Sequence, residues 1–380
     1  VKWDNLARRF GDEELLPMWI ADMDFMSPRP VIEALKKRAD HGIFGYTSLP
    51  GSYFEAIETW LQKRHGWSVQ RKWICTSPGV VTALSIAVNL FTQPGDGVII
   101  QPPVYYPLFS VIKDNGREVV ENPLRLIFRD GQLHYEMDFA DLKEKIARSR
   151  AKMLILCSPH NPVGRVWTRD ELEQLAEICM EHNLLVVSDE IHADIIFPPH
   201  RHIPFASLAP ELAMRSVTCL SPSKTFNLAG LNISLTLIPN DQLRKAFHSF
   251  LRRFVLNSPN LFSALALETA YRYGEEWLDQ LLIYLRENVN YLTRFISEKI
   301  PEIRVVEPEG TYLVWLDCRN LGMGDRELEM FMRKEAKLAL QHGYKFGQGG
   351  EGFVRVNIAC PRSLLQEGLQ RLERAIRKRK

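Results

Sequence analysis

The chain has 380 residues, of which 46% are hydrophobic and 25% are charged, as in ordinary globular proteins. Its formal net charge of +2 argues against nucleic-acid binding driven by backbone electrostatics. No apolar run is long enough to span a bilayer and the N-terminus lacks a signal-peptide pattern, so we expect no membrane contact and a cytoplasmic location. The six cysteines form no Cys-x-x-Cys pair, and we expect them to be free and buried, with no metal site.

In chain order, the middle of the sequence alternates amphipathic helical patterns with short apolar runs. Helices are predicted over Val80–Phe91 and Arg169–His182, and Thr168 with Glu171 forms a capping-box signature before the second helix. Apolar runs predict buried strands at Val98–Ile100, Met153–Cys157, Leu184–Val187 and Ser216–Cys219. This alternation predicts an α/β fold with a mostly parallel sheet that is covered on both faces.

Polar residues follow each of these four predicted strands. Tyr105 comes after the first strand, Asn161 after the second, Asp189 after the third, and Ser221 with Lys224 after the fourth. Sheets of this kind bind ligands at the carboxyl ends of their strands. We therefore expect these side chains to meet in one cleft.

The C-terminal third has a different rhythm, with longer helical patterns and fewer apolar strands. It predicts, in order, a helix from Glu275 to about Lys299, strands at Ile303–Val306 and Tyr312–Leu316, a helix around Arg326–His342, a strand at Phe353–Ile358 and a last helix over Ser363–Arg379. We interpret this as a smaller α+β domain. Residues 1–45 are expected to join the small domain, residues 46–285 to form the large domain, and residues 286–380 to form the C-terminal small domain.

Lys224 is the candidate for covalent chemistry, because it follows a buried strand and lies between Ser223 and Thr225. Burial and nearby cations lower the pKa of a lysine, which frees its amine to attack a carbonyl group. Spacing alone favours a surface loop lysine. Asp189 changes that balance, because pyridoxal phosphate needs an acid beside its pyridine nitrogen. The alternative for Asp189 is a helix-capping or loop aspartate.

In combination and in order, these motifs resemble those of fold-type I pyridoxal-phosphate enzymes, the aspartate aminotransferase superfamily. Within it, the chain most resembles the bacterial cystathionine β-lyase branch. The resemblance extends from the segment Trp19–Phe25 to the segment Gly352–Asn357. It implies an α/β fold of the pyridoxal-phosphate-dependent transferase type I. Such a fold has a large domain with a mostly parallel seven-stranded sheet and a smaller α+β domain.

The resemblance implies roles for the residues that surround the cofactor ring. Lys224 would form the Schiff base and then act as the mobile acid and base. Asp189 would pair with the pyridinium nitrogen, and Asn161 would bond to the phenolic oxygen. His192 stands where aminotransferases usually carry a tyrosine, with a structural histidine bonded to the backbone as the alternative. Tyr105 would stack on the ring and take part in catalysis, although neighbouring Tyr106 competes for that position and is otherwise a core residue.

A second group of residues would hold the phosphate. Gly79, Val80 and Val81 open a predicted helix, whose free N–H groups and positive dipole end suit an anion. Ser221 and Ser223 would complete the phosphate cup. The alternative is an ordinary turn before a core helix.

Two further expectations concern the partner subunit and the substrate. Tyr46 resembles the tyrosine that reaches the phosphate from the other subunit of a homodimer, with a buried aromatic as the alternative. Arg355 resembles the arginine that grips the substrate carboxylate, because a planar fork matches that group, with an exposed strand arginine as the alternative. Ala21 and Asn161 are expected to contact the substrate as well.

One departure from the superfamily pattern bears on the reaction. Many aminotransferases of the superfamily carry a phosphate-binding arginine eight positions after the lysine, where this chain has Asn232. The lyase branch also lacks that arginine. The resemblance therefore implies a carbon–sulfur β-lyase that converts L-cystathionine, cysteine or S-substituted cysteines into a thiol, pyruvate and ammonia. An aminotransferase of the class I/II family is the alternative.

Overall fold

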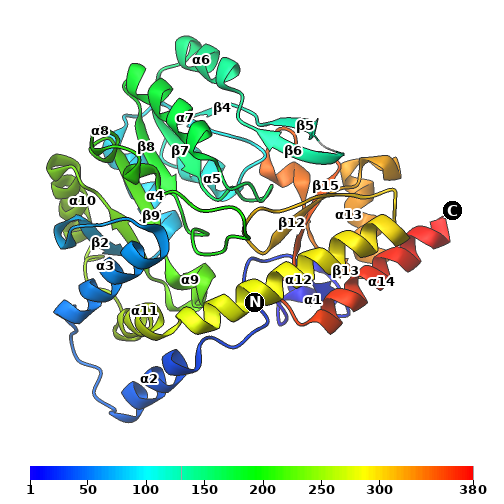
Figure 1. The fold of residues 1–380 in the computed structure, drawn as a ribbon, viewed down its shortest axis with the longest axis horizontal. Coiled ribbons are helices and arrows are strands. Elements are labelled where there is room, and N and C mark those ends of the chain that lie inside the picture. Colours follow the sequence, from blue (N-terminus) through cyan, green and yellow to red (C-terminus); the bar gives the residue numbers. More distant parts are fainter. Residues whose placement is uncertain (130, 380) are drawn as a thin grey trace.

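A seven-stranded sheet forms the centre of the protein in the computed structural model, which describes residues 1–129 and 131–379 (Figure 1). Across the sheet, the strands are β2 (Ile74–Ser77), β10 (Ser234–Leu237), β9 (Ser216–Leu220), β8 (Leu185–Asp189), β7 (Ala151–Cys157), β3 (Gly97–Ile100) and β4 (Glu118–Glu121). Strand β10 is antiparallel to both of its neighbours, and the other pairs are parallel. The predicted mostly parallel seven-stranded sheet is confirmed.

Helices cover both faces of this sheet, which explains why its strands are apolar throughout. Ile155 and Val187 pack into a core on the face of α4, whereas Leu154 and Val186 pack into a core on the face of α7. The helices of this region are α4 (Val80–Phe91), α5 (Pro107–Lys113), α6 (Phe139–Arg148), α7 (Arg169–Glu181), α8 (Pro210–Ala213) and α10 (Asp241–Arg253). The predicted helices at 80–91 and 169–182 are confirmed, and the second carries the predicted capping box.

A group of helices packs beside this sheet and contains the short helix that bears Lys224. It comprises α2 (Arg29–Asp40), α3 (Gly51–His65), α9 (Pro222–Thr225), α11 (Leu261–Tyr273) and α12 (Glu275–Lys299). Helix α11 packs against both α2 and α3. Helix α12 has the predicted bounds and continues without a break through residue 285, where the domain boundary is predicted. That boundary stays a prediction.

The C-terminal region contains a four-stranded antiparallel sheet. Its strands, in order across the sheet, are β11 (Arg304–Val306), β12 (Leu313–Asp317), β15 (Phe353–Asn357) and β14 (Gln341–His342). Helices α13 (Asp325–Lys334) and α14 (Arg362–Arg379) accompany the sheet. A hairpin of β5 (Arg125–Arg129) and β6 (Gln132–Glu136), which follows β4 in the chain, contacts it through β11. The small α+β unit predicted from the sequence is therefore present.

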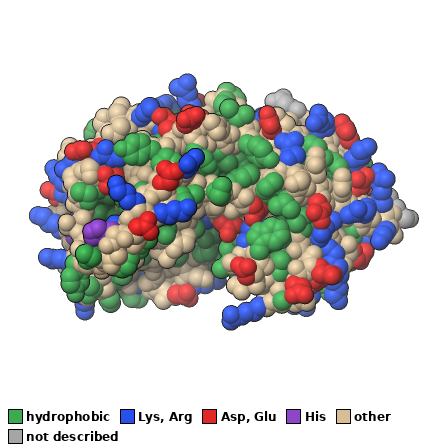
Figure 2. Space-filling model, turned by 90° about the horizontal axis from the view of Figure 1, so that it is seen from below, with side chains coloured by type: hydrophobic (Ala, Val, Ile, Leu, Met, Phe, Trp, Pro, Cys, Tyr) green, Lys and Arg blue, Asp and Glu red, His purple; other side chains and the backbone are tan. Residues whose placement is uncertain are grey.

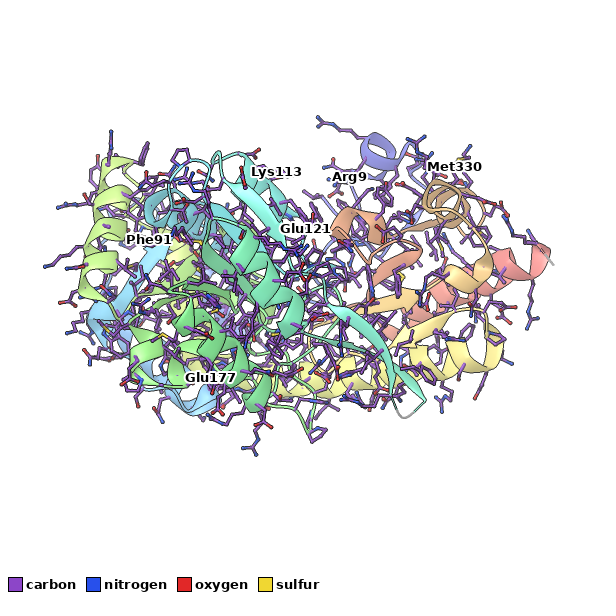
Figure 3. The ribbon with its side chains drawn as sticks, turned by 90° about the horizontal axis from the view of Figure 1, so that it is seen from above. Arg9, Phe91, Lys113, Glu121, Glu177 and Met330 are labelled. Carbon is purple, nitrogen blue, oxygen red and sulfur yellow. The ribbon has the colours of Figure 1, made fainter. Side chains whose placement is uncertain are left out.

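The N-terminal segment contacts this C-terminal region. After α1 (Leu6–Phe10), strand β1 (Leu16–Pro17) pairs in parallel with β13 (Leu338–Ala339). Figure 3 shows Arg9 of α1 in the same half of the molecule as Met330 of α13, with Phe91 of α4 toward the opposite end. Segments that lie far apart in the sequence are thus built into one end of the fold.

The predicted helix around 326–342 is wrong over its second half. Helix α13 ends at Lys334, and Lys337 adopts a left-handed conformation with φ 53° that a helix cannot continue. Residues 338–342 then form two short strands, because their backbone groups pair with the N-terminal segment and with β15. An apolar pattern cannot reveal that a distant strand competes for the same residues.

Three further features concern the surface charges, the helix lengths and the cysteines. Basic and acidic side chains are interspersed on the face of the molecule that Figure 2 shows. No helix within residues 1–129 and 131–379 has the length and apolar character needed to cross a membrane. All six cysteines are free and buried, as predicted.

Candidate active site

One pocket of about 470 Å³ lies at the carboxyl ends of the parallel strands and holds nearly all of the predicted site residues. These are Ala21, Gly79, Val80, Val81, Tyr105, Asn161, Asp189, His192, Ser221, Ser223, Lys224 and Arg355. The predicted convergence of four strand ends on one cleft is confirmed. Tyr46 is the exception: it lies in the exposed connection between α2 and α3 and does not line the pocket.

Lys224 lies in the single turn of helix α9, directly after strand β9. Its Nζ donates a hydrogen bond of 2.5 Å to the carbonyl oxygen of Ala21, which also accepts a bond of 3.1 Å from the hydroxyl of Tyr312. Burial lowers the pKa of Lys224 to about 8, and the charge of Arg355 acts in the same direction. A sizeable share of this amine is therefore neutral near pH 8 and available as a nucleophile or base.

Asp189 ends strand β8 and is buried, with 4% of its surface exposed. Its Oδ1 accepts a hydrogen bond of 3.2 Å from the backbone N–H of Ile191. Burial raises the pKa of Asp189 to about 7. The described side chains form no ion pair with this carboxyl group, so a cationic N–H from a bound molecule would complete its surroundings.

His192 is another buried titratable group at this end of β8. Burial lowers the pKa of His192 to about 3, so the ring stays neutral at physiological pH. Its Nδ1 atom is buried and has no hydrogen-bond partner in the described part of the chain. Tyr312 lies edge-on to the ring at 5.9 Å between centroids. The unpaired nitrogen is available to a bound molecule.

Tyr105 and Tyr106, the two candidates for stacking, both line the pocket. Their ring centroids are 5.6 Å apart and the rings are tilted by 52°. Tyr106 also packs edge-on against Phe346, as a core residue would. Burial raises the pKa of Tyr105 to about 12, so its hydroxyl remains protonated. The stacking role of Tyr105 stays a prediction.

The N-terminus of helix α4 forms another wall of the pocket. Gly79, Val80, Val81 and Thr82 all line it, and no side chain caps the first N–H groups of the helix. Unpaired N–H groups at the positive end of the helix dipole favour an anion. A Cβ atom added at Gly79 would meet no heavy atom within 4 Å. The chain itself therefore leaves this space open to a bound group.

The two serines of the predicted phosphate cup differ in their bonding. Ser221 donates its hydroxyl hydrogen to the carbonyl oxygen of Ile233 at 2.7 Å and accepts from the backbone N–H of Ser223 at 3.1 Å. Its hydroxyl hydrogen is thus already used within the chain, and its lone pairs cap helix α9. Ser223 also lines the pocket, and because its backbone N–H is given to Ser221, its hydroxyl is the group that remains for a bound phosphate.

Arg355 lies in the middle of strand β15 and enters the pocket from the small sheet. Its guanidinium donates to Oδ1 of Asn161 at 3.0 Å and to the carbonyl oxygen of Trp19 at 2.8 Å, while its buried Nε has no partner among the described residues. Burial lowers the pKa of Arg355 to about 10, which still leaves it charged. A buried cation without a counter-ion in the described chain suits an incoming carboxylate.

Sequence reasoning missed several lining residues. Trp19 and Ile20 belong to the quoted N-terminal segment, and Thr82 is one position beyond the quoted helix start. Trp19 and Ile20 could have been found by reading that segment as part of the site, and Thr82 by extending the helix-start motif by one residue. Gln341 was missed for another reason: its strand was predicted as helix, which hid that it pairs with Arg355 across β14 and β15.

Comparisons with known proteins agree with this geometry. The family model for aminotransferase class I and II matches residues 14–372. The chain is 47% identical to cystathionine beta-lyase PatB of Bacillus subtilis over 99% of its own length and 96% of that protein. Among solved structures, cystalysin of Treponema denticola, described as containing pyridoxal 5'-phosphate, has 39% identity and a TM-score of 0.95, covering 100% of this chain and 96% of that chain.

A third similarity is to a protein described as a putative aminotransferase. This structure, from Clostridium difficile 630 and described as bound to pyridoxal phosphate, has 44% identity and a TM-score of 0.96. It covers 99% of this chain and 96% of that chain. The family match spans well over half of the sequence, and the fold and the pocket agree with it. The chain belongs to the aminotransferase class I and II family.

Proposed function

We propose that the protein is a pyridoxal-phosphate-dependent carbon–sulfur β-lyase. It would eliminate the thiol from L-cystathionine, and also from cysteine or S-substituted cysteines, and the remaining three-carbon unit would take up one water molecule to give pyruvate and ammonia. The observation that carries this proposal is the pairing, in one pocket, of a lysine of lowered pKa with a buried acid that lacks a cationic partner. The 47% identity to a cystathionine beta-lyase supports elimination over amino-group transfer.

The residues of the pocket fit pyridoxal phosphate. The open space at Gly79 and the uncapped helix start suit a phosphate group. The buried carboxyl group of Asp189 suits a protonated ring nitrogen, and the unpaired Nδ1 of His192 lies at the same strand end. Pyridoxal phosphate, when bound, supplies an aldehyde that condenses with amines and a protonated ring that spreads negative charge from Cα.

Binding and orientation follow from the contacts described above. Val80 and Val81 would offer backbone N–H groups to the phosphate, and Asp189 would hold a proton on the ring nitrogen. Arg355 would bind the substrate carboxylate with its fork, while Asn161 and the carbonyl of Trp19 keep that fork in place. With the cofactor held at one end and the substrate carboxylate held at the other, the substrate Cα–H bond would point at one face of the site.

Lys224 would carry out the proton transfers. Its neutral Nζ removes the proton from the substrate Cα, which its lowered pKa allows near pH 8. Loss of the thiolate from Cβ then breaks the carbon–sulfur bond. The ammonium form of Lys224 or the protonated hydroxyl of Tyr105 can return a proton to the leaving sulfur. With cystathionine the thiol is homocysteine, the precursor of methionine, and we place this reaction in the cytoplasm.

The deciding experiment supplies purified protein with L-cystathionine and no keto-acid acceptor. A lyase yields pyruvate and homocysteine over many turnovers, and we expect this result. An aminotransferase instead converts its cofactor once to pyridoxamine phosphate and releases no free thiol. That second result would replace the proposed function with the alternative.

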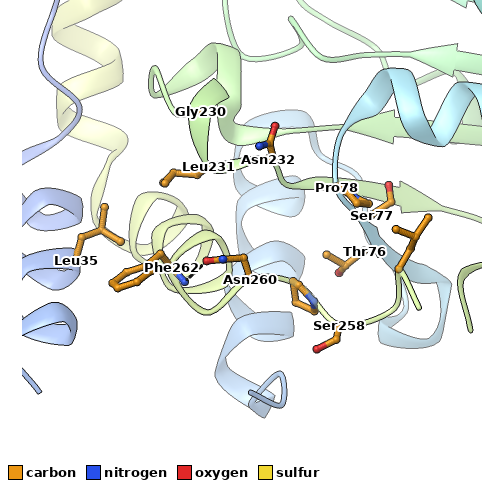
Figure 4. A pocket seen from close by; sticks show the side chains of 12 residues that line it. Leu35, Thr76, Ser77, Pro78, Gly230, Leu231, Asn232, Ser258, Asn260 and Phe262 are labelled. Atoms are coloured by element: carbon orange, nitrogen blue, oxygen red, sulfur yellow. Dashed lines mark hydrogen bonds between the residues drawn. The ribbon is translucent and has the colours of Figure 1, made fainter. Parts of the chain in front are cut away.

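We further propose that the enzyme is a homodimer in which Tyr46 serves the partner's site. Tyr46 is fully exposed, and neighbouring Ile43 and Phe44 are 67% and 60% exposed, which is unusual for clustered apolar side chains. A second cavity of about 470 Å³ adjoins the phosphate end of the pocket, because Pro78 and Asn232 line both. Figure 4 shows side chains of β2, α2 and the start of α11 around it.

Mixing two inactive variants tests this arrangement. Lys224→Ala and Tyr46→Ala proteins are unfolded together and refolded as hybrids. If Tyr46 acts across the interface, each hybrid dimer contains one site with both residues intact, so activity returns to up to about a quarter of wild type by subunit statistics. Refolded mixtures that stay as inactive as the separate variants, or a monomer by sedimentation, would contradict the proposal.

A further inference from the structure

Asp194 is a buried carboxylate close to the active site that does not line the pocket. It lies in the segment that follows β8, five residues after Asp189 and two after His192. Three side chains donate hydrogen bonds to it. Thr225 Oγ1 reaches Oδ2 at 2.7 Å, while His65 Nε2 and Trp60 Nε1 reach Oδ1 at 2.9 and 3.1 Å.

The hydrogen bond from Thr225 links this carboxylate to the helical turn that carries Lys224. Thr225 is fully buried, is the last residue of helix α9 and directly follows Lys224 in the chain. One short stretch at the end of β8, residues 189–194, therefore carries the acid at the pocket, Asp189, and also the anchor of the turn that bears the lysine. The relative placement of acid and amine is fixed by this segment and not only by the spacing of β8 and β9.

The other two donors, Trp60 and His65, bond to the second carboxylate oxygen of Asp194, Oδ1. Trp60 belongs to α3 and stacks on Tyr271 of α11, with 5.1 Å between ring centroids. Burial alone would raise the pKa of Asp194, but the hydrogen bonds from His65 and Thr225 hold it below its usual value. The group is therefore an ionised acceptor, and its bond to Thr225 is charge-assisted. Such a bond is stronger and more directional than one between neutral groups.

We infer that Asp194 is a positioning residue, which through Thr225 holds the turn of Lys224 at the distance that proton transfer at the substrate Cα requires. This inference deepens the proposed function and rests on it. Lysine has a long flexible side chain, so the site controls Nζ mainly by fixing the backbone that carries it. Small displacements of a catalytic group cost much of its rate. Loss of the anchor should therefore slow proton transfer and leave carboxylate binding by Arg355 unchanged.

The chain offers a matched set of variants. Thr225→Val removes the hydroxyl that donates to Asp194, and Thr225→Ser keeps it. Thr218→Val is the control, because Thr218 is fully buried on the adjoining strand β9, lies outside the pocket, and its Oγ1 has no hydrogen-bond partner among the described residues. Asp194→Asn, which removes the charge of the acceptor, is the second test of the same bond.

The reaction measured is exchange of the Cα proton of L-alanine in deuterium oxide, followed by proton NMR with the pyridoxal-phosphate-loaded enzyme. Alanine has no leaving group on Cβ, so this signal reports proton transfer by Lys224 whether the enzyme is a lyase or an aminotransferase. The pH midpoint of the visible absorption band of the loaded protein is recorded in parallel. Melting temperatures of all variants show whether they are folded.

We expect Thr225→Val to slow exchange at saturating alanine by about tenfold or more, with half-saturation changed by less than about twofold. Its absorption midpoint should move by roughly half a pH unit or more. Thr225→Ser and Thr218→Val should stay within about twofold of wild type. Asp194→Asn should behave as Thr225→Val, and it replaces that variant if Thr225→Val does not fold.

Wild-type exchange and an unmoved midpoint in the folded Thr225→Val or Asp194→Asn protein would overturn the inference. So would an equal loss in Thr218→Val, since that would mean general loosening of the sheet. Failure of the proposed function looks different. In that case the wild-type protein itself yields no pyruvate from cystathionine, whatever the exchange rates of the variants.

Discussion

The two sheets contribute to the pocket in different ways. The large sheet supplies Asp189 from the last position of β8, and Asn161 and Lys224 from segments that follow β7 and β9, where these parallel strands end at one edge. The small antiparallel sheet supplies Arg355 and Gln341 from within its strands, as cross-strand neighbours. In the parallel sheet, reactive groups meet because they lie at the ends of neighbouring strands. In the antiparallel sheet, they meet because residues of two strands are paired side by side.

This difference separates the groups that would transfer protons from the group that would bind the substrate carboxylate. Two groups from the large sheet have pKa values moved toward neutrality, as proton transfer requires: Lys224 to about 8 and Asp189 to about 7. At the same strand ends, burial keeps His192 neutral and Tyr105 protonated. Arg355 from the small sheet stays charged and is held by two fixed acceptors. Changes on the large sheet should therefore lower kcat, and changes on the small sheet should raise KM.

Lys224→Ala should have the largest effect. It removes the amine that would hold the cofactor and move the substrate proton, so turnover of cystathionine should fall by at least ~10⁴-fold. The visible absorbance of the cofactor bound through this lysine should also disappear. A variant that keeps both the band and the rate would remove Lys224 from the site.

Asp189→Asn should have the next largest effect. An amide cannot keep a proton on the ring nitrogen, so we expect kcat for cystathionine to fall by ~10²–10³-fold with little change in KM. The variant should still bind the cofactor, which its visible spectrum would show. A rise in KM without loss of kcat would break the division between the two sheets.

Arg355→Lys tests the small sheet. Lysine keeps the charge but loses the fork, so kcat/KM for cystathionine should fall by ~10–100-fold, mainly through KM. Thiol release measured over a range of cystathionine concentrations separates the two constants. An unchanged KM together with a lower kcat would show that Arg355 acts on the chemical step.

The pH dependence of kcat has the smallest expected effect of the four. Below its pKa the amine of Lys224 is protonated and cannot accept the Cα proton, so kcat should rise about tenfold per pH unit and level off above pH 8. Stopped assays of pyruvate from pH 6 to 9.5, with the Arg355→Lys protein as control, measure the curve. A rate that falls through this range would contradict the role of Lys224 as base.

The sequence allowed the seven-stranded sheet to be predicted well, because its signals are local. Apolar runs mark strands that are buried on both faces, and the polar residues after them mark the cleft. Arg355 was reached only through a family resemblance, since nothing local shows which way a mid-strand arginine points. Gln341 was missed because residues 335–342 were predicted as helix. In the structure this stretch contains strands instead, and Leu338 pairs with Leu16.

Asp194 shows a third limit of sequence reasoning. Its partners Trp60, His65 and Thr225 are up to 134 residues distant in the chain, and no spacing rule connects them. Tyr46 is the opposite case, because a predicted site residue lies outside the pocket of its own chain. A group that acts through packing against residues distant in the chain leaves no local signal in the sequence.

The carbonyl oxygen of Ala21 has a consequence for loading of the cofactor. It belongs to the N-terminal segment 19–25, which is tied to two regions of the fold: the backbone N–H of Met23 donates to Asn227, and the side chain of Asn357 donates to the carbonyl oxygens of Ile20 and Asp22. A cofactor held by Nζ of Lys224 would remove the hydrogen bond from Lys224 to Ala21, so that this oxygen keeps only the bond from Tyr312. Occupation of the pocket would thereby change a contact of the segment that joins these two regions.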